Sequence, residues 1–202
     1  MSTSTTLVFA DRVWAPASDR TKNLVRTATL VIGFALLTAA LAQFEVKLSF
    51  TPVPITGQTL GVLLAGAALG WRSGAMSQGL YWILGLIGLP FYAGGKGGWA
   101  DGTGATMGYF IGFIVAAAAI GYMAERKQDR NLVSSIAAMA FGSVVIYAFG
   151  AAWLAHKLNV PVATGDVNAI SLGVTPFLIG DAIKMLLAGA ALPAAWALTD
   201  DR

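Results

Sequence analysis

The chain has 202 residues, of which 56% are hydrophobic and only 11% are charged. Soluble domains carry about 25% charged residues, so this composition is too poor in charge to cover a surface in water, and it predicts an integral membrane protein. The absence of cysteine and the single histidine, His156, exclude disulfides, thiolate catalysis and metal sites built from several such ligands. The net charge is +3 without a dense basic run, so we do not expect nucleic acid as a partner. We expect no bound cofactor either.

Residues 1–23 are polar and mixed in charge, and they lack the short apolar core and Ala-x-Ala cleavage site of a signal peptide. We expect them to form a cytoplasmic tail. About 20 apolar residues are needed to cross the hydrocarbon core of a membrane. Six segments are predicted to do so, the second of them short: 24–44, 55–71, 73–90, 105–123, 132–155 and 172–198.

These segments predict an all-α fold, a bundle of six transmembrane helices over residues 24–198 with a short C-terminus at 199–202. An even number of spans places both termini on one side of the membrane. Nine of the 13 Lys and Arg residues fall on the side of the termini, whereas only three lie on the other side: Lys47, Lys96 and Lys157. Because loops rich in Lys and Arg stay in the cytoplasm, both termini are predicted to be cytoplasmic.

The three connections on the opposite side are rich in proline, glycine or polar residues. Loops carry function when a rigid scaffold positions them, so we expect a ligand site that opens outward. The stretch AGGKGG at 93–98 is not a phosphate-binding loop, because Gly97 replaces the required Ser or Thr and Pro90 replaces the first glycine. ATP hydrolysis by this chain is therefore not expected. A His-Glu-x-x-His zinc motif and a Gly-x-Ser-x-Gly nucleophile elbow are also absent from the sequence.

The last predicted span contains two opposite charges, Asp181 and Lys184, in the stretch FLIGDAIKMLLAG at 177–189. On a helix that begins near Leu172 they share a face and lie roughly 12–18 Å along it. An unpaired charge inside a membrane costs about 3 kcal/mol, so both side chains must face protein or water. Two interpretations remain open: a salt bridge that only fixes the helix, or a cavity wall that binds a polar solute.

In the second interpretation, the aspartate accepts hydrogen bonds from N–H groups and the lysine donates to a carbonyl or carboxylate. Tyr81, Trp82 and Tyr92 are candidates for the apolar walls, and Gln58 is a candidate for a further polar contact. Small residues spaced four apart, such as Ala35 and Ala39, allow helices to approach closely, within the chain or against a partner membrane protein.

Four stretches carry a resemblance to a known family. PVPITGQTLGVLLAG (52–66), YWILGLIGLPFYAGGKGG (81–98), GATMGYFIGF (104–113) and GVTPFLIGDAIK (173–184) resemble, in order and spacing, the BioY family. Its members are the biotin-specific substrate-binding subunits, or S components, of energy-coupling-factor transporters. The resemblance implies a six-helix S-component fold in a bacterial plasma membrane. It also implies capture of biotin from outside, with a transmembrane coupling protein and a pair of cytoplasmic ATPases as partners.

The resemblance also implies roles for individual residues. Asp181 and Lys184 match the family's Gly-Asp-x-x-Lys element, which resembles a ligand for the ureido ring of biotin. Gln58 matches the loop after the first span, although Gly57 replaces the usual leucine-like residue before it. Lys96 lies in a glycine loop that resembles a lid and would meet the biotin carboxylate. Ala35 and Ala39 resemble the small-residue face that meets the coupling protein.

Three alternatives stay open at this point. The first is an S component for another small vitamin. The second is an intramembrane enzyme for a lipid-like substrate, for which the sequence supplies no evident nucleophile. The third is a purely structural subunit that binds no ligand.

Overall fold

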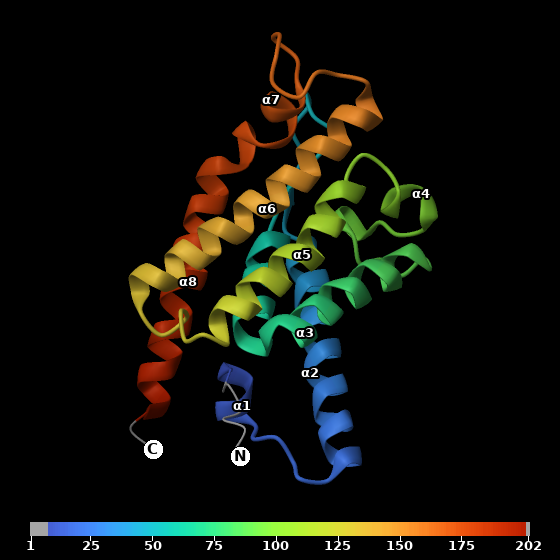
Figure 1. The fold of residues 1–202 in the computed structure, drawn as a ribbon. Helices are drawn as coiled ribbons and strands as arrows, with labels where there is room; N and C mark the ends of the chain where they lie inside the picture. The colour runs from blue at the N-terminus through green and yellow to red at the C-terminus, as the bar shows by residue number, and fades with distance from the viewer. Residues whose placement is uncertain (1–7, 201–202) are drawn as a thin grey trace.

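The computed structural model describes residues 8–200, which form a bundle of helices with one short β-hairpin (Figure 1). Residues 1–7 of the predicted N-terminal tail and residues 201–202 of the predicted C-terminus lie outside the described part. In chain order the elements are α1 (Phe9–Val13), α2 (Arg20–Ala42), β1 (Glu45–Val46), β2 (Ile55–Thr56), α3 (Gln58–Leu86), η1 (Ala93–Gly95), α4 (Trp99–Gly102), α5 (Met107–Ala124), α6 (Leu132–Leu158), α7 (Ala169–Gly173), η2 (Thr175–Phe177) and α8 (Leu178–Asp200). The two strands pair antiparallel, with Glu45 opposite Thr56.

Four segments in the described part are long and apolar enough to cross a membrane: Arg20–Ala42, Met107–Ala124, Leu132–Leu158 and Ala169–Thr199. They correspond to the first, fourth, fifth and sixth predicted spans. The mostly helical membrane fold is therefore confirmed. The count of six spans is not, because the second and third predicted spans have a different form.

The second and third predicted spans are one element, α3, that changes direction at Gly70 (Figure 1). Gly70 has φ +81°, a conformation that glycine adopts without steric cost. The backbone N–H of Trp71 donates to Glu125 Oε1 at 3.1 Å, which replaces a helical hydrogen bond lost at the break. At about 1.5 Å per residue, the parts on either side are about 18 and 24 Å long, and each is shorter than a hydrocarbon core of about 30 Å.

Helix α5 lies between α3 and α6, and glycines bring its backbone close to both neighbours. A Cβ atom on Gly66 of α3 would lie 2.6 Å from the carbonyl oxygen of Ala117. A Cβ on Gly108 of α5 would lie 2.4 Å from the carbonyl oxygen of Phe149 on α6. These small residues therefore serve packing within the chain, and they fix α3 and α6 on opposite sides of α5.

The small-residue face of α2 also packs inside the chain. Ala35 and Ala39, predicted to meet a coupling protein, are 0% and 6% exposed and belong to the main hydrophobic core. The same face of α2 contacts α3, where a Cβ on Gly61 would lie 2.9 Å from Thr38 Oγ1. The structure thus packs this face of α2 against α3.

Helix α8 begins later than the sequence predicts. The chain forms α7 and then the 3₁₀ turn η2, which contains Pro176, before α8 starts at Leu178. Proline lacks the N–H that a continuous helix needs, which accounts for this interruption. Asp181 consequently lies in the first turn of α8, and the predicted position roughly 12–18 Å along a continuous helix is wrong.

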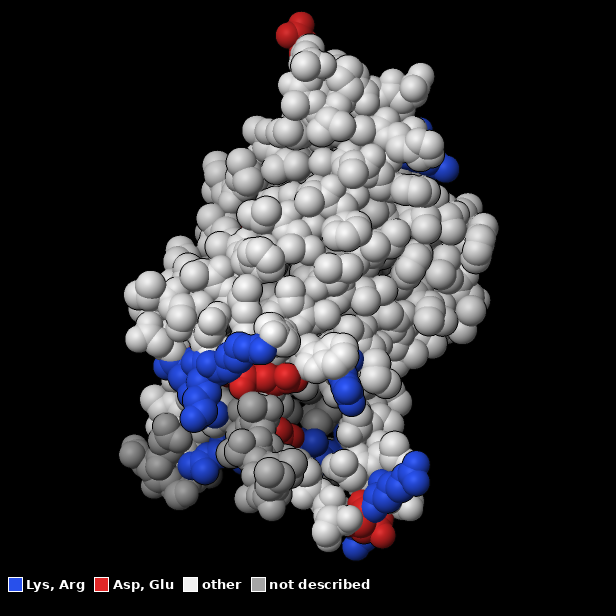
Figure 2. All heavy atoms as spheres, viewed as in Figure 1, with Lys and Arg blue, Asp and Glu red and all other residues white. Residues whose placement is uncertain are grey.

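Part of the predicted polar tail folds against the bundle. In α1 the ring of Phe9 meets Trp196 of α8 edge-on at 5.6 Å. Arg26 of α2 is buried and binds Asp11 Oδ1 at 2.8 Å and the carbonyl oxygen of Trp14 at 2.6 Å. Charged side chains gather at this end of the molecule, whereas the middle of the visible face is uncharged (Figure 2).

Candidate functional site

A cavity of about 340 Å³ lies at the end of the bundle opposite α1, among the β-hairpin, the glycine-rich loop before α5, and helices α3, α5, α6 and α8. This volume falls within the range of about 300–1,000 Å³ that is typical of small-molecule sites. Its apolar wall includes Phe110, Phe113, Ile146 and Phe177. Its polar lining includes Thr56, Gln58, Thr59, Tyr147, Asp181 and Lys184.

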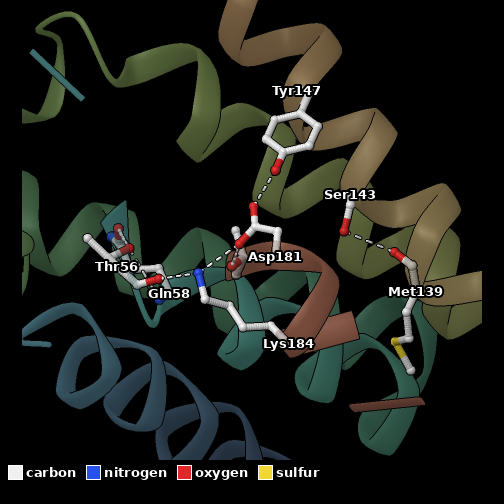
Figure 3. Close-up of polar contacts among 8 residues, drawn as sticks. Thr56, Gln58, Met139, Ser143, Tyr147, Asp181 and Lys184 are labelled. Carbon is white, nitrogen blue, oxygen red and sulfur yellow. Dashed lines mark hydrogen bonds and ion pairs between the residues drawn. The ribbon is translucent and has the colours of Figure 1, made fainter. Parts of the chain in front are cut away.

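The predicted charged pair lines this cavity. Lys184 Nζ lies 2.7 Å from Asp181 Oδ1, and the Asp181 residue is 4% exposed. Asp181 also accepts a hydrogen bond from Thr59 of α3 at 2.8 Å and one from Tyr147 of α6 at 2.5 Å. Figure 3 shows the phenol of Tyr147 pointing at the carboxylate. The pair therefore joins α8 to α3 and α6, and it also faces the cavity, so features of both sequence interpretations are present.

The lysine of the pair reaches the β-hairpin. Lys184 Nζ donates to the carbonyl oxygen of Thr56 at 2.6 Å (Figure 3). The Thr56 hydroxyl donates in turn to Gln58 Oε1 at 2.7 Å. Gln58 Nε2 donates to the Tyr81 hydroxyl at 2.5 Å. This chain of bonds connects the pair to Gln58, which is the first residue of α3 and lines the cavity.

Gly57 permits this placement of Gln58. A Cβ at Gly57 would lie 2.7 Å from the carbonyl oxygen of Leu41, at the end of α2. The N–H of Gly57 donates to that same carbonyl at 3.1 Å. The glycine therefore lets the start of α3 approach α2, which gives a physical reason for the departure from the leucine-like residue expected there.

Tyr81 and Trp82 lie behind the cavity wall. Tyr81 is 0% exposed, and its ring meets Phe110 edge-on at 6.0 Å. Trp82 stacks on Phe110 at 6.3 Å, and its Nε1 donates to the carbonyl oxygen of Gly102 at 3.0 Å. Neither residue is part of the cavity lining. They support Phe110, which is part of it.

Tyr92 and Lys96 place the glycine loop over the cavity. The Tyr92 ring stacks on Phe110 at 4.7 Å, and its hydroxyl donates to the carbonyl oxygen of Trp82 at 2.7 Å. The backbone of Tyr92 pairs with that of Lys96, with an N–H to oxygen distance of 2.9 Å. The Lys96 side chain lies in the cavity lining and is exposed. Within residues 8–200 it forms neither an ion pair nor a hydrogen bond.

Sequence reasoning missed several residues of the lining, above all Thr59 and Tyr147. Both are uncharged and lie in predicted spans, where a single hydroxyl group does not distinguish a binding residue from a packing residue. A buried carboxylate needs several hydrogen-bond donors. A search of the other spans for hydroxyl groups that could donate to Asp181 would therefore have identified both residues as candidates. Within the described residues, no group of three or more His, Cys, Asp and Glu side chains is placed to hold a metal ion.

The fold and cavity define a helical membrane protein with a cavity of small-molecule size among its helices. The sequence profile of the BioY family matches residues 11–201. The chain belongs to the BioY family, and the predicted resemblance is confirmed.

Individual relatives agree with this assignment. The chain is 39% identical to the biotin transporter BioY of Rhizobium etli over 176 residues, which cover 83% of this chain and 89% of that protein. It is 37% identical to the biotin transporter BioY of Rhodobacter capsulatus, over 81% of this chain and 90% of that one. A crystal structure of the S-component for biotin from an ECF-type ABC transporter superposes with a TM-score of 0.77, at 30% identity over 88% of this chain and 94% of that one.

Proposed function

We propose that this chain is a biotin-binding S component that captures biotin and mediates its uptake, energised by a coupling protein and an ATPase pair. The cavity that contains the Asp181–Lys184 pair carries this proposal, because it combines a buried acceptor and donor with aromatic walls. Biotin offers the matching groups: N–H donors, a carbonyl, a carboxylate and an apolar ring. The names of the relatives and the S-component structure support the same conclusion. A BioY chain of this kind is a transport subunit, not an enzyme.

The two ends of the cavity suit the two ends of biotin. The ureido ring is proposed to meet Asp181 and Lys184, with Gln58 beside them. At the loop end, Lys47 pairs with Glu45 at 3.0 Å, whereas Lys96 has no such partner among the described residues. Lys96 is therefore the cation proposed to meet the biotin carboxylate.

The orientation in the membrane is proposed from the positions of the cations. We infer that six membrane segments, with α3 contributing two short ones, place both termini in the cytoplasm of a bacterial cell and the cavity on the outer side. The excess of Lys and Arg near the termini supports this orientation. A coupling protein would then meet exposed residues of the bundle, because Ala35 and Ala39 are covered by α3.

Calorimetry with the purified chain in detergent tests the proposal. We expect near one-to-one binding of biotin. Asp181→Asn is expected to weaken binding by about 1.5–3 kcal/mol, since it removes a charged acceptor. Asp166→Asn, in an exposed loop outside the cavity lining, is the matched control and should bind like the unaltered chain. A folded, biotin-free sample that gives no heat with biotin, but binds another vitamin in a competition series, would contradict the proposed ligand.

A further inference from the structure

The hydrogen bonds around Asp181 leave one of its oxygens with spare capacity. Each carboxylate oxygen accepts about two hydrogen bonds. Oδ1 already accepts two, from Thr59 at 2.8 Å and from Lys184 at 2.7 Å. Oδ2 accepts one, from Tyr147 at 2.5 Å. A ligand N–H that approaches the carboxylate is therefore directed to Oδ2, the oxygen beside the Tyr147 phenol.

The phenol of Tyr147 has a fixed polarity in this arrangement. A tyrosine hydroxyl has one proton to donate and also accepts. Its proton is donated to Asp181 Oδ2 at 2.5 Å. Toward the cavity, which Tyr147 lines, the phenol oxygen can therefore act only as an acceptor. Tyr147 and Asp181 Oδ2 form two neighbouring acceptors, one from α6 and one from α8.

A donor lies on the other side of the same carboxylate. The Lys184 ammonium carries three protons, and two of them are directed to Asp181 and to the carbonyl of Thr56. One proton remains. The site thus presents acceptors beside a single strong donor, which complements a ligand edge made of an N–H next to a carbonyl.

From this pattern we propose that Tyr147 contacts the ligand directly and determines specificity. Its phenol oxygen accepts, together with Asp181 Oδ2, the N–H at one edge of a cyclic urea, while Lys184 donates to the urea carbonyl. This inference rests on the proposed function and adds a selection rule to it. A head group that places an oxygen where that N–H lies is rejected, because two acceptor oxygens then face a third.

The test compares ligands that differ by one atom. Two cyclic carbamate analogues of biotin, each with one of the two ring N–H groups replaced by oxygen, keep the size of the ring. The unaltered chain is expected to bind the analogue altered at the Tyr147 edge about 100-fold or more weakly than biotin, because sites built to bond an N–H discriminate strongly. Tyr147→Phe should lower that discrimination by about tenfold and leave discrimination against the other analogue unchanged.

Tyr122→Phe is the matched control, since Tyr122 is 52% exposed on α5 and outside the cavity lining, and bonds Arg126. It should discriminate like the unaltered chain. If Tyr147→Phe does not fold, fluorotyrosine at position 147 serves instead, because fluorine makes the hydroxyl a better donor and the oxygen a poorer acceptor. A residue that only positions Asp181 would keep its effect with fluorotyrosine, whereas an acceptor for the ligand would lose discrimination.

The proposal is overturned if Tyr147→Phe discriminates against both carbamates as the unaltered chain does. Tighter binding of biotin by that variant would also overturn it, since Tyr147 would then compete with the ligand for Asp181. Failure of the unaltered chain to bind biotin at all is a different outcome. It would remove the proposed function and this inference together.

Discussion

Two buried ion pairs at opposite ends of the molecule look alike and differ in what surrounds them. Asp181–Lys184 has a charge separation of 2.7 Å and Asp11–Arg26 one of 2.8 Å. Arg26 also binds the carbonyl of Trp14, so its pair fastens the N-terminal segment to α2. The cavity beside it, about 210 Å³, has no aromatic side chain in its lining. The first pair instead borders a larger cavity, of about 340 Å³, with aromatic walls.

This difference separates a structural ion pair from one suited to a ligand. A buried pair by itself is weak evidence for either stability or function, because desolvation offsets the attraction between the charges. The feature that indicates a ligand here is an adjacent cavity of molecular size with aromatic walls, which, of these two pairs, only the Asp181–Lys184 pair borders. Four substitutions test whether the two ends of the molecule differ in this way, and their expected effects decrease from the first to the last.

The largest effect is expected at the structural pair. Arg26→Met leaves Asp11 without its cation, and breaking a buried pair in this way costs about 3–5 kcal/mol of stability. Thermal unfolding in detergent should show the loss, while biotin affinity measured well below the new midpoint stays within about twofold. Arg20→Met, at an exposed position of the same helix, should change neither. A variant that loses affinity as strongly as stability would break the distinction between the two pairs.

The second effect is expected at the pair in the cavity. Lys184→Met should keep the fold, because Asp181 retains its bonds to Thr59 and Tyr147. It should weaken biotin binding by about 1.5–3 kcal/mol, the contribution of a charged hydrogen bond. Calorimetry measures the affinity, with Lys157→Met at the exposed end of α6 as control. An unfolded Lys184→Met product would instead identify this pair as a purely structural one.

The third effect concerns the glycine loop over the cavity. Gly94 has φ +68°, and a Cβ there would lie 2.5 Å from Glu45 Oε1. Gly94→Ala is therefore strained by about 1–2 kcal/mol and should displace the loop. Faster dissociation of biotin, by about 5–30-fold, is the expected result in a stopped-flow or filter assay. Gly33→Ala, where nothing lies within 4 Å of the new methyl group, should release biotin at the unaltered rate.

The smallest effect is expected at the end that holds the structural pair, in the connection between α5 and α6. Burial raises the pKa of Asp129, partly offset by its bond from Trp196 and by the nearby Arg130. The folded state therefore holds this proton more tightly than the unfolded chain does, so stability is lost as the pH rises from about 4, the usual carboxyl value, through the raised pKa. Asp129→Asn has no carboxyl group to ionise, so its stability does not fall with rising pH for this reason. Its thermal midpoint should exceed that of the unaltered chain by a margin that grows with pH, whereas a constant margin would contradict the raised pKa.

The sequence predicted the features that depend on composition or on rare residues. Asp181 and Lys184 were identified because charged residues are rare in the predicted spans. Gln58 was identified because it follows the stretch PVPITG, which resembles a family motif. Features that depend on three-dimensional packing were not predictable in the same way. Gly70 is one of 24 glycines, and only its positive φ in the structure shows that the chain turns there. The delayed start of α8 has a local cause in Pro176, which a span chosen by hydropathy alone does not take into account.

Tyr147 shows the same limit within the site. It is an ordinary aromatic residue of an apolar segment until α6 and α8 pack and bring its hydroxyl to Asp181. Ala35 and Ala39 show the converse. Their spacing predicts close helix contact without specifying the partner, and the partner in this structure is α3.

An experimental structure of the chain with bound biotin tests the central claim most directly. The ureido ring is expected at the Asp181–Lys184 end of the cavity, with its carbonyl within hydrogen-bond distance of Lys184 Nζ and one N–H at Asp181 Oδ2 and the Tyr147 oxygen. The carboxylate is predicted at the loop end, near Lys96. Biotin bound in the reverse direction, with its carboxylate on Lys184, would contradict the account.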